Sequence, residues 1–373
     1  MQIGILSEPT DQRVALVPEV IKQLIGGNNQ VLVESGAGDQ SYISDQDYIE
    51  SGAKVTNSTE IFGSSELIIS INKLPLESYD QLQDGTAVIS SFQPFNDVII
   101  SKELSIRNLT VFSMDMVPRI TLAQAMDVLS SMASIAGYQA VLQAATHLPR
   151  YFPMLTTAAG TIPPAKVLVL GAGVAGLQAI ATAKRLGGVV EAFDTRLAAK
   201  EEVESLGAKF VMVEGATDDK AAGGYAVEQS EDYKQKQQAL IQEKAEKADV
   251  IITTAQLRGK PAPLLVTEAT VKLMKPGAVI VDLAASTGGN CELTRNNETI
   301  QVHAVTIIGN SDLAQNVPMH ASQLYSKNIF NFLKVLITDE GKLNLDLENE
   351  ILKSSCIAHA GQDLFNRSMN SDR

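Results

Sequence analysis

Short apolar runs alternate with segments of helical periodicity along the chain. In the first third, runs rich in valine, isoleucine and phenylalanine are separated by polar or glycine-containing stretches, a pattern typical of buried strands joined by helices. The predicted strands there cover residues 3–6, 30–34, 54–56, 66–71, 87–92 and 110–114. Strands that alternate with helices in this way favour an α/β fold with largely parallel sheets.

The same alternation returns in the second half of the chain. Predicted strands there cover residues 167–170, 189–193, 209–213, 249–253, 278–283 and 306–308. These six strands with helical crossovers fit the two mononucleotide-binding halves of a Rossmann-like domain. The pattern therefore predicts two Rossmann-like α/β domains with mostly parallel sheets.

Two long segments of helical composition join these domains. Residues 122–148 are rich in alanine, methionine and glutamine, and they predict one long helix leading from the first domain into the second. Residues 318–336 predict a helix that returns the chain to the first domain. We therefore expect a discontinuous N-terminal domain, residues 1–135 plus 320–373, and a second domain of residues 136–319.

The composition narrows the functional classes. The formal net charge of −13 over 373 residues disfavours binding to nucleic acid or to an anionic membrane surface. Two cysteines are too few for a disulfide scaffold and favour a reducing compartment. The four histidines and two cysteines show no metal-ligand spacing, so we assign no metal. No window reaches the ~20 apolar residues that span a bilayer, and residues 1–7 are typical of a strand rather than a signal peptide.

The strongest single motif is Gly171-x-Gly173-x-x-Gly176, which follows an apolar strand and opens an alanine-rich helix. In this motif the first glycine permits a tight turn, the second lets the backbone approach a pyrophosphate, and the third lets the helix pack on the strand. Asp194 lies roughly 20 residues on, where a carboxylate accepts from ribose hydroxyls and repels a 2′-phosphate. The motif predicts that residues 136–319 bind NAD(H) rather than NADP(H). The predicted contacts are Gly171, Gly173, Val174, Ala175, Gly176, Asp194, Thr195 and Arg196.

Two further loops have unusual composition. Residues 214–229 are long, polar and glycine-rich, which is typical of a lid or binding loop. Residues 287–292 follow a strand end and contain two consecutive glycines, so the backbone there is expected to adopt positive φ or to approach another group closely. Cys291 in this loop has no neighbouring histidine or lysine to lower its pKa, which favours a buried thiol over a nucleophile.

Other candidate residues have a plain structural alternative. Gln124 and Asp127 share a face of the predicted helix, but their spacing alone favours a capped, solvated helix start. Tyr225 could close over an adenosine or simply be exposed. Arg13 and Lys73 could bind a substrate carboxylate, although surface charge is the simpler interpretation of each.

Taken together, these motifs show a resemblance that spans essentially the whole chain. It resembles the NAD(H)-binding component of proton-translocating NAD(P) transhydrogenase (domain I, the alpha subunit or its first part), which is related to alanine dehydrogenase. The stretches that carry the resemblance are residues 11–18, 118–131, 157–160, 169–178, 223–226, 253–255, 259–263, 281–285 and 288–292. In combination they are far more specific than any one motif.

The resemblance implies roles for individual residues. Arg119, Gln124 and Asp127 match the family's loop that holds the nicotinamide end of NAD(H), and Ser130 matches a nearby polar contact. The glycine motif and Asp194 match the pyrophosphate and ribose contacts. The remaining matches are Gly224 and Tyr225, in the mobile loop that folds over the adenosine, and Gln256, at a contact where relatives commonly have leucine.

The same resemblance separates two activities. Alanine dehydrogenases use an arginine and a lysine for the substrate, which match Arg13 and Lys73, and a histidine and an aspartate for acid–base work. The histidine position here is Gln93 and the aspartate position is Ser286, neither of which exchanges a proton near neutral pH. Direct hydride transfer between two nicotinamides needs no such group, only close and oriented rings. We therefore favour transhydrogenase over an alanine dehydrogenase-type amino-acid dehydrogenase, with a NAD-binding subunit without turnover as a third class.

The resemblance also implies partners. We expect a homodimer that passes hydride between its NAD(H) and an NADP(H) held on a partner subunit, with transfer coupled to proton translocation by membrane-spanning subunits. The chain would then be cytoplasmic, lying on the cytoplasmic face of the inner membrane through those subunits, and it would bind no nucleic acid. The polar residues 366–373 suit a subunit that ends before the membrane-spanning portion, and equally a truncation.

Overall fold

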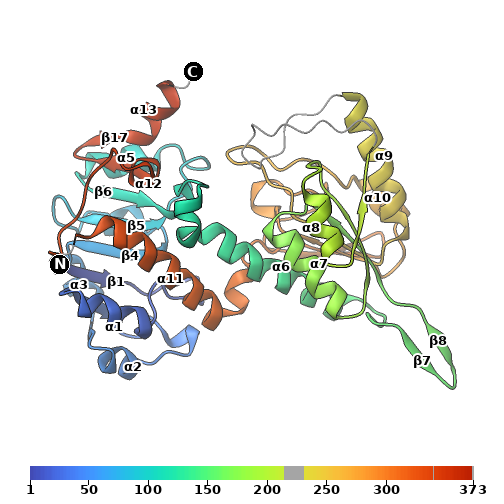
Figure 1. Cartoon of the computed structure of the whole chain (residues 1–373), viewed down its shortest axis with the longest axis horizontal. Helices are drawn as coiled ribbons and strands as arrows, with labels where there is room; N and C mark the ends of the chain where they lie inside the picture. Colours follow the sequence, from blue (N-terminus) through green and yellow to red (C-terminus); the bar gives the residue numbers. More distant parts are fainter. Residues whose placement is uncertain (214–230, 339, 372–373) are drawn as a thin grey trace. The chain divides into compact units, whose positions relative to one another are not determined.

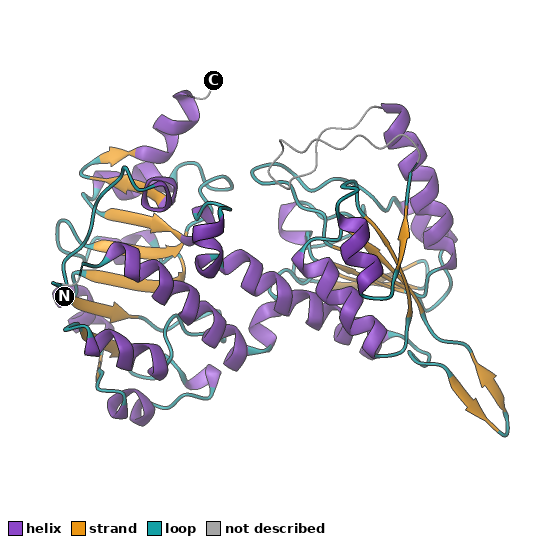
Figure 2. Ribbon diagram, viewed as in Figure 1, coloured by secondary structure: helices purple, strands orange, loops and turns teal. Residues whose placement is uncertain are grey.

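The computed structural model describes residues 1–213, 231–338 and 340–371 (Figure 1). The chain divides into two compact units. Unit 1 comprises Met1–Met132 and Gln315–Arg373, and unit 2 comprises Ala133–Ala314. Both units are mixed α/β, with helices packed around a central sheet (Figure 2).

Unit 1 contains, among its described residues, an eight-stranded sheet in the order β17-β16-β6-β5-β4-β1-β2-β3. The six strands from β3 to β6 run parallel, and β16 and β17 add antiparallel at one edge. Their bounds are β1 Gln2–Ile5, β2 Gln30–Glu34, β3 Lys54–Thr56, β4 Leu67–Asn72, β5 Ala87–Ser91, β6 Thr110–Ser113, β16 Cys356–His359 and β17 Gln362–Asp363. The order reverses between β1 and β4, as in a doubly wound fold.

The sheet of unit 1 is covered on both faces because its strands are apolar at successive positions. Ile3 and Ile69 belong to one buried cluster, whereas Ile68 and Val88 belong to another on the opposite face. The helices of unit 1 are α1 Pro18–Gly26, η1 Asp39–Ser41, α2 Asp45–Glu50, α3 Ser58–Ser64, α4 Leu76–Tyr79, α5 Ile100–Ile106, η2 Met114–Met116, η3 Thr121–Met126, α11 Pro318–Leu336, α12 Glu350–Ser355 and α13 Leu364–Ser371.

Unit 2 contains a seven-stranded sheet within its described residues, in the order β11-β10-β9-β12-β13-β15-β14. Only β14 runs antiparallel to its neighbour, and the order reverses between β9 and β12. The strands are β9 Lys166–Leu170, β10 Val189–Phe193, β11 Lys209–Val211, β12 Val250–Thr253, β13 Val279–Asp282, β14 Thr299–Val302 and β15 Val305–Ile308. A separate hairpin, β7 Leu155–Thr157 and β8 Gly160–Ile162, projects away from this sheet (Figure 1).

Helix α6 (Val128–His147) begins in unit 1 and continues into unit 2. The other helices of unit 2 are α7 Val174–Arg185, α8 Ala199–Ser205, α9 Glu231–Lys247, α10 Glu268–Leu273, η5 Ala285–Thr287 and η6 Leu313–Asn316, whose last two residues lie in unit 1. Asp249 closes the amino end of the sheet, because it is buried and accepts from Arg150 at 2.6 Å and Lys275 at 2.9 Å. Although burial opposes ionisation, these cations and the Lys166 N–H together lower the pKa of Asp249.

The predicted α/β class is confirmed, and each predicted strand has a counterpart within a few residues. The predicted helix over residues 122–148 is wrong at its start. Residues 121–126 form the 3₁₀ helix η3, and α6 begins only at Val128 and then runs without a break through Gly137. The strands β7, β8, β14, β16 and β17 were not predicted.

Candidate functional site

The glycine loop of unit 2 joins β9 to α7, at the point where the strand order reverses. Gly171 has φ +104°, and a Cβ there would lie 2.5 Å from Thr254 Oγ1. A Cβ on Gly176 would lie 1.9 Å from the carbonyl oxygen of Gly171, so the first turn of α7 packs directly on the loop. At Gly173, by contrast, no described atom lies within 4 Å of the Cβ position. The loop therefore has two crowded glycines and one open glycine, the arrangement that close backbone approach by a phosphate requires.

The amino end of α7 is also held from behind. Helix α6 crosses it at Gly137, where a Cβ would lie 2.1 Å from the carbonyl oxygen of Ala175. No side chain caps α7 at Gly173, and Val174 is half exposed. The first N–H groups of α7 are thus presented by a rigid backbone, which is the standard basis for anion binding at a helix start.

Asp194 ties the glycine loop to the end of β10. Its Oδ2 accepts from the Ala172 N–H at 2.7 Å, and its Oδ1 accepts from the Arg196 N–H at 2.8 Å. The Arg196 guanidinium adds Nε at 3.0 Å and Nη2 at 2.9 Å, which makes a bidentate ion pair. Thr195 between them is half-buried. The structure thus brings the predicted residues of the loop and of β10 together, with the carboxylate beside the loop backbone.

The segment after β12 faces the same loop and is held by residues that were not predicted. Thr254 Oγ1 donates to the Gly171 carbonyl at 3.1 Å. Asn290 fixes both backbone groups of Ala255, accepting from its N–H at 3.0 Å and donating to its carbonyl at 2.8 Å. Gln256, a predicted contact, donates its amide to the Leu283 carbonyl at 2.9 Å. In this structure Gln256 therefore links the loops after β12 and β13.

Asp282 at the end of β13 organises the second of these loops. The buried carboxylate accepts from the Asn290 N–H at 2.8 Å, the Cys291 N–H at 3.0 Å and Thr294 Oγ1 at 2.7 Å. Gly288 and Gly289 next to it have φ +104° and +82°, so the positive φ predicted for this loop is confirmed. Burial raises the pKa of the Cys291 thiol to about 11, which confirms a buried, unreactive cysteine.

The predicted nicotinamide loop lies in unit 1, around η3. Arg119 and Gln124 are exposed, on either side of the start of this 3₁₀ helix. Asp127 ends η3 and caps α6, since its Oδ1 accepts from the Ser130 N–H at 2.9 Å and its Oδ2 from the Ser130 hydroxyl at 2.6 Å. Gln124 and Asp127 are thus carried by a 3₁₀ turn and its end, not by the helix that was predicted.

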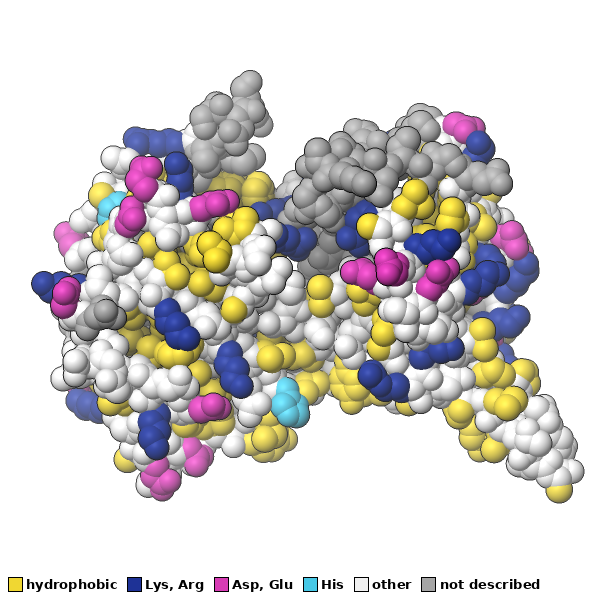
Figure 3. All heavy atoms as spheres, viewed as in Figure 1, with side chains coloured by type: hydrophobic (Ala, Val, Ile, Leu, Met, Phe, Trp, Pro, Cys, Tyr) yellow, Lys and Arg dark blue, Asp and Glu magenta, His cyan; other side chains and the backbone are white. Residues whose placement is uncertain are grey.

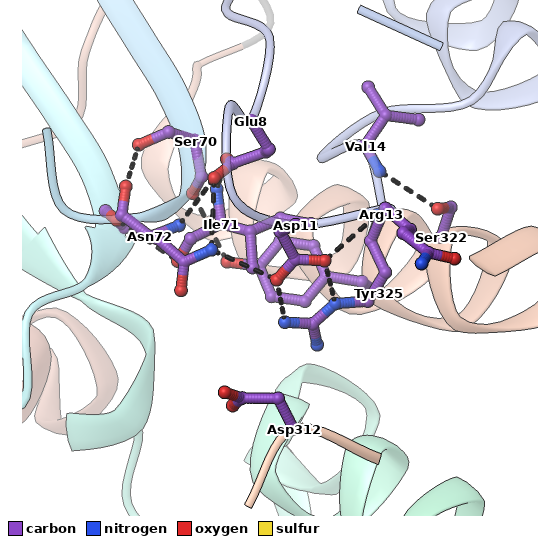
Figure 4. A network of polar contacts seen from close by, with 12 residues as sticks. Glu8, Asp11, Arg13, Val14, Ser70, Ile71, Asn72, Asp312, Ser322 and Tyr325 are labelled. Carbon is purple, nitrogen blue, oxygen red and sulfur yellow. Dashed lines mark hydrogen bonds and ion pairs between the residues drawn. The ribbon is translucent and has the colours of Figure 1, made fainter. Parts of the chain in front are cut away.

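The strand-order reversal of unit 1 is filled by the chain's own polar side chains (Figure 4). Glu8, after β1, accepts from the backbone of Ile71 and from Asn72 Nδ2 at 3.1 Å. Asn72 Nδ2 also donates to Asp11 at 3.1 Å, and Asp11 forms a bidentate ion pair with Arg13. Burial raises the pKa of Glu8 to about 7, against the opposing hydrogen bonds from Ile71 and Asn72.

The groups that match an amino-acid dehydrogenase are likewise engaged or altered. Lys73 forms an ion pair with Asp97 at 2.6 Å, as Arg13 does with Asp11. Gln93 has φ +50° and accepts from Asn96 Nδ2 at 3.2 Å. Ser286 lies in η5. Gly224 and Tyr225 lie outside the described residues. Within the described portion of the chain, no helix is long and apolar enough to cross a bilayer.

Comparison with known proteins decides the family. The family model for the alanine dehydrogenase/PNT N-terminal domain matches residues 4–136, and that for the C-terminal domain matches residues 140–366. The chain belongs to the alanine dehydrogenase/PNT family. It is 41% identical to NAD(P) transhydrogenase subunit alpha of Haemophilus influenzae, over 98% of this chain and 72% of that one. It is also 41% identical to the first of the polypeptides that make up subunit alpha in Rhodospirillum rubrum, over 97% of each chain.

A solved structure extends the match to the fold. A transhydrogenase from Sinorhizobium meliloti superposes with a TM-score of 0.89 at 41% identity, covering 97% of this chain and 100% of that one. The alanine dehydrogenases of the family are more distant, and the enzyme of Mycolicibacterium smegmatis is 30% identical over 81% of this chain and 78% of its own length. The two-domain α/β fold is common to the family, so identity and site chemistry, rather than fold, separate its two activities.

Proposed function

We propose that this chain is the NAD(H)-binding alpha component of an NAD(P) transhydrogenase. The observation that carries the proposal is the glycine loop of unit 2, with its open Gly173, its crowded Gly171 and Gly176, and Asp194 hydrogen-bonded to the loop backbone. The 41% identity to the Rhodospirillum rubrum alpha polypeptide over nearly the full length of both chains supports the same assignment.

In this proposal each predicted residue has one task. The backbone of Gly171, Gly173 and Gly176, with the first turn of α7 at Val174 and Ala175, binds the pyrophosphate. The segment Asp194 to Arg196 contacts the adenosine ribose and selects NAD(H) over NADP(H). Arg119, Gln124, Asp127 and Ser130 orient the nicotinamide, while Gly224, Tyr225 and Gln256 complete the cofactor contacts.

The chemistry is a direct hydride transfer. C4 of NADH gives a hydride to C4 of NADP⁺ held by a partner subunit, which yields NAD⁺ and NADPH with no proton taken up or released. Gln93 and Ser286 cannot act as acid or base near neutral pH, and this reaction needs neither. Arg13 and Lys73 are already paired with Asp11 and Asp97, which argues against a role in holding an amino-acid substrate.

We further propose a homodimer that binds NADP(H)-carrying and membrane-spanning partner subunits, lies against the cytoplasmic face of the inner membrane and couples hydride transfer to proton translocation. The projecting hairpin β7–β8 supports the dimer. An isolated two-stranded hairpin is marginal in water. Apolar side chains gather where this hairpin leaves unit 2, among them Tyr151 and Met154, which are 55% and 63% exposed (Figure 3). A second copy of the chain would cover them.

The test is hydride transfer in a mixture. The protein is combined with the isolated NADP(H)-binding subunit of a transhydrogenase, NADH and a spectrally distinct NADP⁺ analogue, and single-turnover reduction of the analogue is followed. We expect transfer only when both proteins are present, and no NADH formation from alanine plus NAD⁺. Alanine turnover without transfer would overturn the proposal in favour of an amino-acid dehydrogenase. Tight NADH binding without either reaction would indicate a binding subunit.

A further inference from the structure

Helix α11 fastens several separate segments of unit 1 through buried side chains. Four of them bond to backbone groups that are distant in the sequence. Ser322 accepts from the Val14 N–H at 3.0 Å, Ser326 accepts from the Val17 N–H at 3.0 Å, Tyr325 donates to the Ser70 carbonyl at 3.3 Å, and Asn328 donates to the Ala125 carbonyl at 2.8 Å. The last of these contacts reaches the 3₁₀ helix η3, which carries Gln124 and ends at Asp127.

Asn328 is an expensive side chain for this position. It is 7% exposed, and its Oδ1 is buried without a hydrogen-bond partner among the described residues. An unpaired buried oxygen costs about as much as one good hydrogen bond gains, so the amide contributes little net stability. A leucine of similar shape would avoid the unpaired oxygen. What leucine cannot do is hold the carbonyl of Ala125.

That carbonyl lies at the centre of the proposed nicotinamide loop. Ala125 directly follows Gln124 and stands two residues before Asp127. The turn itself is weakly closed, because the Asp127 N–H reaches the Gln124 carbonyl only at 3.3 Å. Asn331, one turn further along α11, also donates to the Ala125 carbonyl, at 3.3 Å, but it is exposed and divides its amide with the Lys327 carbonyl at 3.0 Å. Asn328 is therefore the main tether of η3 to α11.

We propose that Asn328 is a positioning residue for hydride transfer: by holding the Ala125 carbonyl it sets the orientation in which Gln124 and Asp127 present the nicotinamide of NAD(H). The inference rests on the function proposed above. It differs from a purely structural role, because the loop is to be placed accurately rather than made more stable. Small displacements of orienting groups are known to cost up to ~100-fold in rate.

The first test is Asn328→Leu in the full chain, measured for NADH affinity, single-turnover transfer to the partner subunit and urea unfolding. We expect transfer to fall about tenfold, while affinity changes by less than about threefold and stability stays unchanged. The matched control is Asn331→Ala, which removes only the longer, exposed bond to the same carbonyl and should transfer at nearly the wild-type rate. Unchanged transfer in Asn328→Leu, or parallel losses of stability, affinity and rate, would overturn the proposal.

The second test is Asn328→Asp, which keeps the shape of the side chain and serves if the leucine variant does not fold. A carboxylate cannot donate to the Ala125 carbonyl, whereas the protonated acid can. The rate relative to wild type should therefore rise as the pH falls, and a pH-independent ratio would contradict the tether. Failure of the function itself looks different. In that case the wild-type protein would bind NADH and transfer nothing, and both proposals would fall together.

Discussion

Ser130 donates two hydrogen bonds to Asp127, from its N–H to Oδ1 at 2.9 Å and from its hydroxyl to Oδ2 at 2.6 Å. Asp127 is therefore the capping residue of α6 as well as a member of the proposed nicotinamide loop. The two interpretations of this residue, helix cap and cofactor contact, are compatible. The cap places the carboxylate at the junction of η3 and α6, where a cofactor group can share it.

Substitutions at Asp127 separate these two roles. Asparagine also caps helices, so Asp127→Asn should keep the free energy of unfolding while it lowers single-turnover transfer more than NADH affinity. Asp127→Ala should in addition lose about 1 kcal/mol of stability, because the cap is removed. Urea unfolding, NADH titration and single-turnover kinetics measure the three quantities. A collapse of affinity with an intact transfer rate in Asp127→Asn would show that the residue does not orient the ring.

Asp194 is expected to determine the choice between NADH and NADPH. In Asp194→Asn the side chain keeps its shape but loses the charge that repels a 2′-phosphate, and Arg196 is released from its ion pair. The ratio of the dissociation constants for NADPH and NADH should fall by about tenfold or more. The matched control is Glu191→Gln, on the same strand, where the carboxylate pairs with Lys244 at 3.1 Å. An unchanged ratio in Asp194→Asn would remove the selectivity role.

The strands could be predicted because most of them are buried on both faces and are apolar at successive positions. Val167, Leu168 and Val169 illustrate this, since alternate residues fill the clusters on opposite sides of the sheet. The strands that were missed lack this signal. β14 alternates between exposed and half-buried residues, and β7 and β8 are almost wholly exposed. The start of α6 was missed because apolar residues continue through η3, although Asp127 and Ser130 form a recognisable cap.

The site was predictable where local backbone rules apply. Gly171 and Gly176 act through their own turn, so their spacing in the sequence is informative. Asn290 and Asn328 act on backbone groups 35 and 203 residues away, and nothing in the neighbouring sequence indicates those partners. Pairing of this kind depends on tertiary packing. A buried asparagine is therefore best found in the structure, by asking which carbonyl it holds.

Gly173 and Gly176 should respond differently to alanine. Gly173→Ala places a methyl group in open space at normal φ, so stability should fall by at most about 1 kcal/mol, the preference of a helix cap for glycine over alanine. NADH binding should nevertheless weaken about tenfold or more, because the methyl group occupies the approach of the pyrophosphate. Gly176→Ala meets the Gly171 carbonyl at 1.9 Å and should cost roughly 3 kcal/mol of stability. Normal NADH binding by Gly173→Ala would contradict the phosphate site.

Glu8 should make the stability of the protein depend on pH near neutrality. Burial, reinforced by the nearby charge of Asp11, raises its folded-state pKa from 4.5 to about 7, despite hydrogen bonds from Ile71 and Asn72. Because the folded state retains the proton more tightly, the stabilisation is complete below pH 4.5 and is lost as the pH rises through 7. Between pH 5 and 8 the free energy of unfolding should fall by up to roughly 3 kcal/mol from this group.

The check is urea unfolding of wild type and Glu8→Gln across that range. Glutamine keeps the acceptor oxygen without a titrating proton, so the variant should lose most of the slope and be the more stable protein at pH 8. Glu60→Gln is the matched control, because hydrogen bonds from Lys54 and Thr56 lower the pKa of that exposed carboxylate, which places its effect below pH 4.5. Equal slopes in wild type and Glu8→Gln would mean that Glu8 is ionised throughout, and that the network with Asn72 and Asp11 holds a carboxylate rather than a proton.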